Sequence, residues 1–70
     1  MKNADYILAK DAVKSGRPIT KQTMAELKEM NAQYVKHIKK LAAKGDTEQA
    51  MWFREEQMEI MDVISAAKVE

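Results

Sequence analysis

The sequence has no cysteine, one histidine (His37), one proline (Pro18) and two glycines among its 70 residues. The absence of cysteine excludes disulfide scaffolds, thiolate zinc sites and a cysteine nucleophile. Two glycines cannot build a glycine-rich loop around a phosphate, and no Ser-His-Asp set accompanies the lone histidine. These absences predict a protein that is not an enzyme and that holds no cofactor and no metal.

Long apolar runs and an excess of one charge are also missing. Twelve lysines and arginines face eleven aspartates and glutamates, so the net charge is +1 and gives no field that draws a protein onto nucleic acid. No apolar stretch approaches the roughly 18 residues of a membrane span, and the first 16 residues lack a signal-peptide core. We therefore expect a cytoplasmic protein that binds neither nucleic acid nor membranes.

What the sequence does have is the composition of a helical protein, with 46% hydrophobic and 33% charged residues. A chain this short buries only about 60% of the surface that its unfolded form exposes, which makes a monomer marginal. Small domains compensate with disulfides, a metal or oligomerisation. Since the first two are excluded, we expect a single helical domain over 1–70 that forms a homo-oligomer.

Gly16 and Gly45 each follow a segment with helical periodicity and lysines in its last turns, as helix ends do. Asn3, Thr20 and Asp46 stand where N-caps are expected. The predicted helices are 4–14, 21–44 and 47–68. The apolar side of the first is expected to comprise Leu8, Ala9, Ala12 and Val13.

The two long predicted helices carry matching apolar stripes with 3-4 spacing, and the tight connection between them predicts an antiparallel helical hairpin. This turn sets Ile38 against Phe53 and Tyr34 against Gln57. Asn31 and Gln57 interrupt the stripes, and we expect each amide to pair locally, for example Gln57 with Tyr34, and so to fix the register.

The last predicted helix has a second apolar face, on which Met51, Met58 and Met61 lie with Trp52 beside them. One hairpin cannot cover both faces, so a second protomer is expected to complete a four-helix core or a larger bundle. Methionines at helical spacing are also common in ordinary cores, but they suit adaptable interfaces as well. These four residues are the predicted oligomer interface.

The start of the second helix combines free backbone N–H groups, the cations Arg17 and Lys21 and the hydroxyl of Thr23. Such a place can hold phosphate, and Tyr6 could stack on a base there if the first helix folds back. Ordinary helix capping by Thr20 is the alternative. The candidate ligand-binding residues are Tyr6, Arg17, Lys21 and Thr23.

Two charged patterns allow more than one interpretation. The carboxylates of Glu55, Glu59 and Asp62 share one helix side as in di-iron bundles, but no Glu-x-x-His motif accompanies them. The alternative is an interhelical charge pattern in which Lys36 lies opposite Glu55. The lysines near the end of the second helix could likewise contact nucleic acid or acidic lipid, or only complement the helix dipole.

Tyr6, a helix start with Lys21 and Thr23, and the run Glu48-Gln49-Ala50-Met51-Trp52 together resemble a known family. These are the small helical phage proteins that sequester cyclic oligonucleotide signals of the CBASS anti-phage defence, which carry a similar Glu-x-x-Met-Trp element near their C-terminal end. The resemblance covers about ten residues. It implies a homo-oligomer that binds cyclic dinucleotides between protomers through Tyr6, Lys21 and Thr23.

The sequence thus predicts a non-enzymatic, homo-oligomeric binding module, a phage or bacterial accessory protein that inhibits or scaffolds an unidentified protein partner. A phage anti-defence sponge for cyclic nucleotide signals is the alternative function. The first depends on the methionine face, and the second depends on the start of the second helix.

Overall fold

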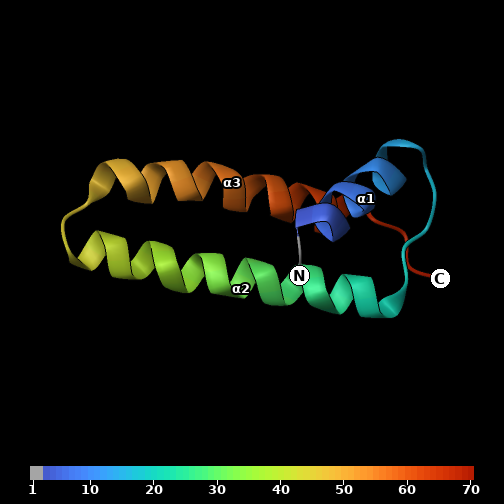
Figure 1. Cartoon of the computed structure of the whole chain (residues 1–70), viewed down its shortest axis with the longest axis horizontal. Helices are drawn as coiled ribbons and strands as arrows, with labels where there is room; N and C mark the ends of the chain where they lie inside the picture. The colour runs from blue at the N-terminus through green and yellow to red at the C-terminus, as the bar shows by residue number, and fades with distance from the viewer. Residues whose placement is uncertain (1–2) are drawn as a thin grey trace.

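The computed structural model describes residues 3–70, with side chains from Ala4 onward. This part of the chain forms three helices and no strand: α1 (Asn3–Lys14), α2 (Lys21–Ala43) and α3 (Thr47–Ala66) (Figure 1). The predicted all-helical fold class is confirmed. The N-cap predicted at Asn3 concerns a side chain outside the described part, and α1 itself begins at this residue.

The starts of the two long helices have the capping contacts that the sequence predicts. The Thr20 hydroxyl accepts a hydrogen bond from the backbone N–H of Thr23 at 3.1 Å, and the Asp46 carboxylate accepts one from that of Gln49 at 3.2 Å. Each contact satisfies one of the N–H groups that a helix start leaves without a partner. Gly45 follows α2 at a φ of 81°, a left-handed conformation that glycine adopts without steric cost.

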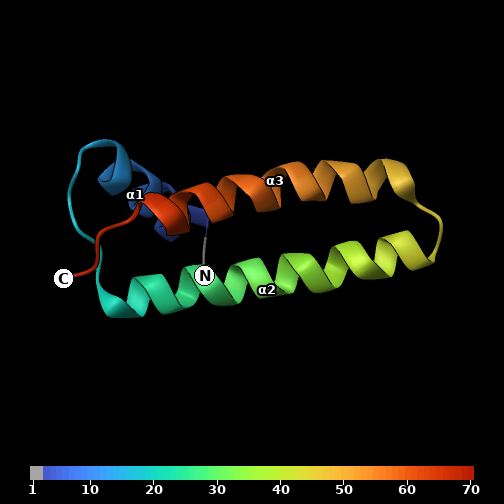
Figure 2. The same ribbon diagram turned by 180° about the vertical axis from the view of Figure 1, so that it is seen from behind.

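α2 and α3 lie side by side and run in opposite directions (Figures 1 and 2). Two hydrogen bonds join them: Gln57 Nε2 donates to Asn31 Oδ1 at 2.8 Å, and the Tyr34 hydroxyl donates to Glu56 Oε2 at 3.1 Å. The predicted pairing of Gln57 with Tyr34 is therefore wrong, although both amides do pair across the two helices.

The register differs from the prediction because α2 ends at Ala43, so the turn is centred on Gly45 and not between Gly45 and Asp46. The ring of Phe53 consequently lies edge-on between the rings of His37, at 4.6 Å, and Tyr34, at 6.0 Å between centroids. A shift of one residue turns a helix by about 100°, which is enough to exchange the partner of each side chain.

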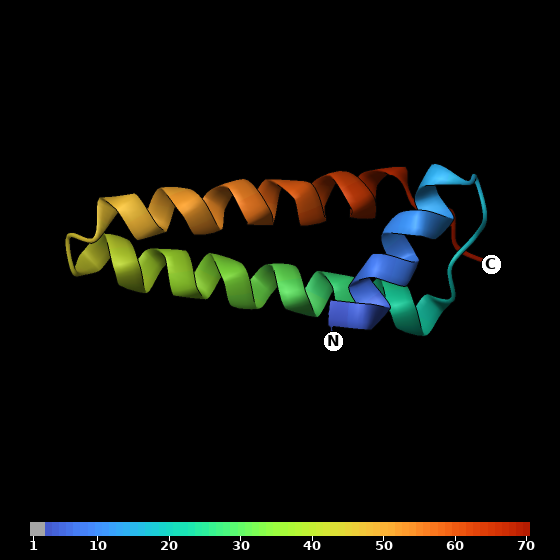
Figure 3. The ribbon, with the colours of Figure 1, turned by 45° about the horizontal axis from the view of Figure 1, so that its top comes forward.

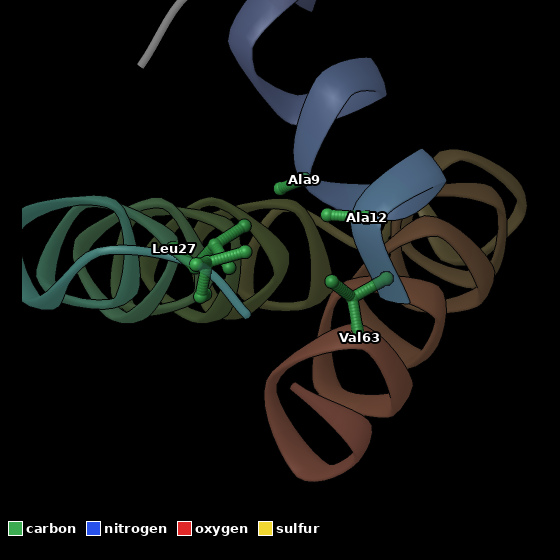
Figure 4. Packing of buried hydrophobic residues seen from close by; sticks show 5 residues of the cluster. Ala9, Ala12, Leu27 and Val63 are labelled. Carbon is green, nitrogen blue, oxygen red and sulfur yellow. The ribbon is translucent and has the colours of Figure 1, made fainter. Parts of the chain in front are cut away.

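α1 lies across the α2–α3 pair near the end opposite their connecting turn (Figure 3). Its residues Ala9 and Ala12 are buried, and they approach Leu27 of α2 and Val63 of α3 (Figure 4). Leu27 is the only fully buried large side chain among the described residues. The small alanines let α1 pack on the helix pair, chiefly against α3, so α1 completes the core at this end.

Leu8 is a correction to the predicted apolar side of α1, because 65% of this side chain is exposed. Tyr6 packs against the core instead, together with the half-buried Val13. The side that faces the core is therefore centred on Ala9, with Tyr6 three residues before it and Val13 four residues after it, and this spacing keeps all three on one helix side.

The chain after α3 is extended, which explains why α3 ends at Ala66, two residues before the predicted end. The N–H of Ile19 donates to the carbonyl of Lys68 at 2.7 Å, and the N–H of Glu70 donates to the carbonyl of Ile19 at 3.1 Å. These bonds form a parallel bridge between Ile19 and Val69. Pairing with the linker before α2 replaces the last helical turn.

The molecule is elongated, with principal extents of 41 × 19 × 19 Å. Each long helix is covered along one side by its neighbour, and α1 covers only one end of the pair (Figures 2 and 3). The outer sides of α2 and α3 therefore stay open along most of their length. None of the three helices in residues 3–70 combines the length and the apolarity that a bilayer crossing requires.

Candidate functional site

The outward side of α3 carries a row of exposed methionines, which we call the α3 outer face: Met51, Met58 and Met61. Their exposed fractions are 66%, 58% and 42%. The spacings of seven and three residues place them on one side of the helix, away from the buried Ile60. Three of the four predicted interface residues thus share one accessible apolar face in the single chain.

Trp52, the fourth predicted interface residue, lies to one side of this row. Its side chain is 56% exposed, and its ring meets Phe53 edge-on at 4.7 Å. It lines an open hollow with Asp46, Glu48 and Gln49 at the start of α3. Trp52 follows Met51 directly, and a rotation of about 100° places it on a neighbouring side of α3, outside the methionine row.

Acidic side chains border the α3 outer face. Glu48, Glu55 and Asp62 are exposed and recur every seven residues, so they follow the methionines along the helix. α3 as a whole has five carboxylates and one cation, Arg54. The exposed side of α3 is therefore apolar and acidic together.

The outer side of α2 has the opposite charge. We call its exposed lysines Lys28, Lys36, Lys39 and Lys40 the α2 outer face. α2 contains five lysines and two glutamates. Across the described residues the one ion pair is Lys10 with Glu59, at 2.8 Å. The predicted contact between Lys36 and Glu55 is thus not formed, because the two residues lie on opposite outer sides of the helix pair.

At the predicted phosphate site, the start of α2, the side chains of Thr20 and Thr23 make helix-capping contacts. Besides accepting from the N–H of Thr23, the Thr20 hydroxyl donates to the Thr23 hydroxyl at 2.9 Å. Arg17 and Lys21 are exposed, and the first turn of α2 contains no carboxylate. The cations are thus accessible, while the hydroxyl of Thr23 already has a partner.

The structure does not bring the four predicted ligand-binding residues together within one chain. Thr23 lines a hollow of about 430 Å³ between α1 and the start of α2, and the carboxylate-bearing residues Asp5 and Glu26 line it as well. Tyr6 lines a separate hollow with Tyr34 and Glu59. Carboxylates at the first hollow oppose a phosphate there, and Tyr6 does not reach it.

The surroundings of Tyr6 were not apparent from the sequence. Its hydroxyl is buried and has no hydrogen-bond partner among the described residues. Burial raises the pKa of Tyr6, and the carboxylate of Glu59 adds to the effect. Burial also raises the pKa of Tyr34, whose hydroxyl donates to Glu56. Both phenols are therefore protonated at neutral pH. In the sequence, only the i, i+4 spacing of Tyr6 and Lys10 indicates that the side chains of these two residues lie close together.

The acidic residues do not assemble into a metal centre in the part of the chain that the structure describes, where no three His, Asp or Glu side chains come close enough together. Glu59 is paired with Lys10, and Glu55 and Asp62 are exposed on the outer side of α3. His37 contacts the ring of Phe53. The carboxylates thus act as surface charge and as the partner of Lys10.

The chain matches no protein-family model, no curated protein and no solved structure. Two accessible surfaces carry the chemistry that bears on function: the α3 outer face with its acidic border, and the oppositely charged α2 outer face.

Proposed function

We propose that this chain is a small, non-enzymatic binding module that works as a homo-oligomeric helical bundle. The hairpin of α2 and α3 is the unit that associates, and the α3 outer face is the interface. In the assembled form the module inhibits or scaffolds a protein partner, as a cytoplasmic accessory protein of a phage or bacterium. The observation that carries the proposal is the row of three exposed methionines.

Exposure of the α3 outer face to water costs free energy in a single chain. Transferring a methionine side chain from water into an apolar contact contributes about 1.5–3 kcal/mol when burial is complete. The core that the single chain forms is small, with Leu27 alone fully buried among large side chains of the described part. Covering Met51, Met58 and Met61 on several copies would therefore add a large share to a marginal stability.

The cyclic-nucleotide sponge makes different demands that the geometry supports less well. Tyr6 and Thr23 line separate hollows in one chain, so a ligand that contacts Tyr6, Lys21 and Thr23 must lie between two copies. The sponge also needs a positive site, and Asp5 and Glu26 line the hollow beside Thr23. We therefore favour the protein-binding module.

Sedimentation velocity across the micromolar range tests the proposal. We expect the wild type to sediment as a dimer or a larger species. Met58→Asp places a charge in the middle of the α3 outer face, and it should weaken association by at least roughly tenfold, which corresponds to about 1.4 kcal/mol.

Leu8→Asp is the matched control, because Leu8 is exposed to 65% and lies on α1, away from this face. It should leave the sedimentation unchanged. A wild type that stays monomeric and melts cooperatively would contradict the proposed function, as would a loss of association in Leu8→Asp equal to that in Met58→Asp.

A further inference from the structure

The α3 outer face needs a surface that tolerates its acidic border, and the chain itself carries one. The exposed lysines of the α2 outer face extend from Lys28 to Lys40, about 18 Å along the helix. The acidic row on α3 extends from Glu48 to Asp62, about 21 Å. Glu29 is exposed on the same side of α2, seven residues before Lys36, so the lysines outnumber it four to one. The two rows thus have opposite net sign and nearly equal length.

We propose that the α3 outer face of one copy packs against the α2 outer face of a second copy, so that the chains join head to tail. This inference rests on the proposed self-association, and it adds which surface of the second copy the methionines contact. It names the occupant of the α3 outer face as a second copy of the same chain.

Charge decides against the simplest alternative, a two-fold contact of α3 with α3. That contact would bring two rows of carboxylates together, with Arg54 as the sole cation on each helix. Like charges across an interface oppose association, whereas rows of opposite sign favour it. Since neither Glu55 nor Lys36 has an ion-pair partner within residues 3–70, both remain available for a second copy.

The shapes of the two faces also agree. Ala32 is exposed on the outer side of α2 between Lys28 and Lys36, and Ala25 is exposed three residues before Lys28. Small residues leave room for long, flexible methionine side chains. The aliphatic stems of lysines can cover the rest of the methionine row while their ammonium groups reach the carboxylates.

The position of the two faces sets the form of the assembly. α2 and α3 meet through their inner sides, so their outer faces lie on opposite sides of the pair (Figures 1 and 2). Each copy then offers one α3 outer face and one α2 outer face. A contact between unlike surfaces repeats from copy to copy. The assembly therefore gains copies as the concentration rises, unless the rotation between neighbouring copies closes a ring.

A charge swap tests the inference. The α2 variant carries Lys36→Glu, Lys39→Glu and Lys40→Glu, which make the α2 outer face negative, and the α3 variant carries Glu55→Lys and Asp62→Lys. All five residues are exposed, so both variants should keep the wild-type circular dichroism spectrum. In each variant alone the two faces have the same sign, and association at low salt should weaken by roughly ten- to a hundredfold.

An equal mixture of the two variants should assemble again, because every contact then joins faces of opposite sign. A single chain with all five substitutions should also assemble, which excludes unfolding as the cause of the loss. Added salt should weaken the wild-type contact, because charges on exposed faces are screened beyond about 10 Å at 0.1 M.

The outcomes separate the two proposals. If the wild type associates and the α2 variant associates equally well, the head-to-tail contact is wrong while the proposed self-association stands. If both variants lose association and the mixture does not regain it, the two faces do not meet. A monomeric wild type would overturn both proposals.

Discussion

The polar pair between Asn31 and Gln57 shows how single residues set the register of α2 and α3. The 2.8 Å hydrogen bond between their amides is half-buried, inside stripes that are otherwise apolar. Removing one partner leaves the other amide without its hydrogen bond, and removing both leaves an apolar contact. Replacing one amide should therefore destabilise the protein, whereas replacing both should not.

We expect Asn31→Leu alone to lower the free energy of unfolding by about 1 kcal/mol, because Gln57 loses its partner. For a domain of this size the melting temperature should fall by roughly 4–8 °C. Asn31→Leu combined with Gln57→Leu should regain the wild-type value or exceed it. Thermal unfolding followed by circular dichroism checks both, and additive losses in the double variant would show that the two amides do not interact.

Among the elements, α1 depends most on its tertiary contacts. It has 12 residues, and isolated helices of this length are marginal in water. Its attachment involves the buried Ala9 and Ala12 and the ion pair of Lys10 with Glu59. The exposed ion pair contributes little. Burial of the alanines therefore holds α1 in place.

Ala9→Glu should detach α1, because a carboxylate without a partner would replace a methyl group that is only 3% exposed. We expect a loss of at least about 2 kcal/mol in stability and rapid hydrogen exchange of the amides in 4–14. Leu8→Glu is the control, since it adds the same side chain at an exposed position of the same helix. Equal effects of the two substitutions would show that the propensity of α1, and not its docking, limits its stability.

At the scale of the whole molecule, the two candidate functions differ in what they ask of the start of α2. Titration calorimetry with a panel of cyclic dinucleotides and trinucleotides should give no heat of binding, because carboxylates border the hollow at Thr23 and Tyr6 lies elsewhere. Heat that disappears in Lys21→Ala but persists in Lys40→Ala would instead support the sponge. Both lysines are exposed, so neither change should affect the fold.

The whole molecule also shows how far the methionine row could be predicted. Helical spacing alone placed Met51, Met58 and Met61 on one face, since three residues on one helix need no tertiary information. The separation of Trp52 from that row was less evident. It depends on the contact of Trp52 with Phe53 and on the hollow at the turn.

By itself the sequence determined the three helices and their caps at Thr20 and Asp46, because helix periodicity and capping are local properties of the chain. Only the tertiary structure decided the partners across helices: Gln57 with Asn31, Tyr34 with Glu56, and Tyr6 instead of Leu8 against the core. It also decided that α3 ends early, where the backbone pairs with Ile19. The physical reason is that a shift of one residue in the register is small along the sequence, but it rotates the side chains by about 100° around the helix axis. Such a rotation changes every contact between the helices.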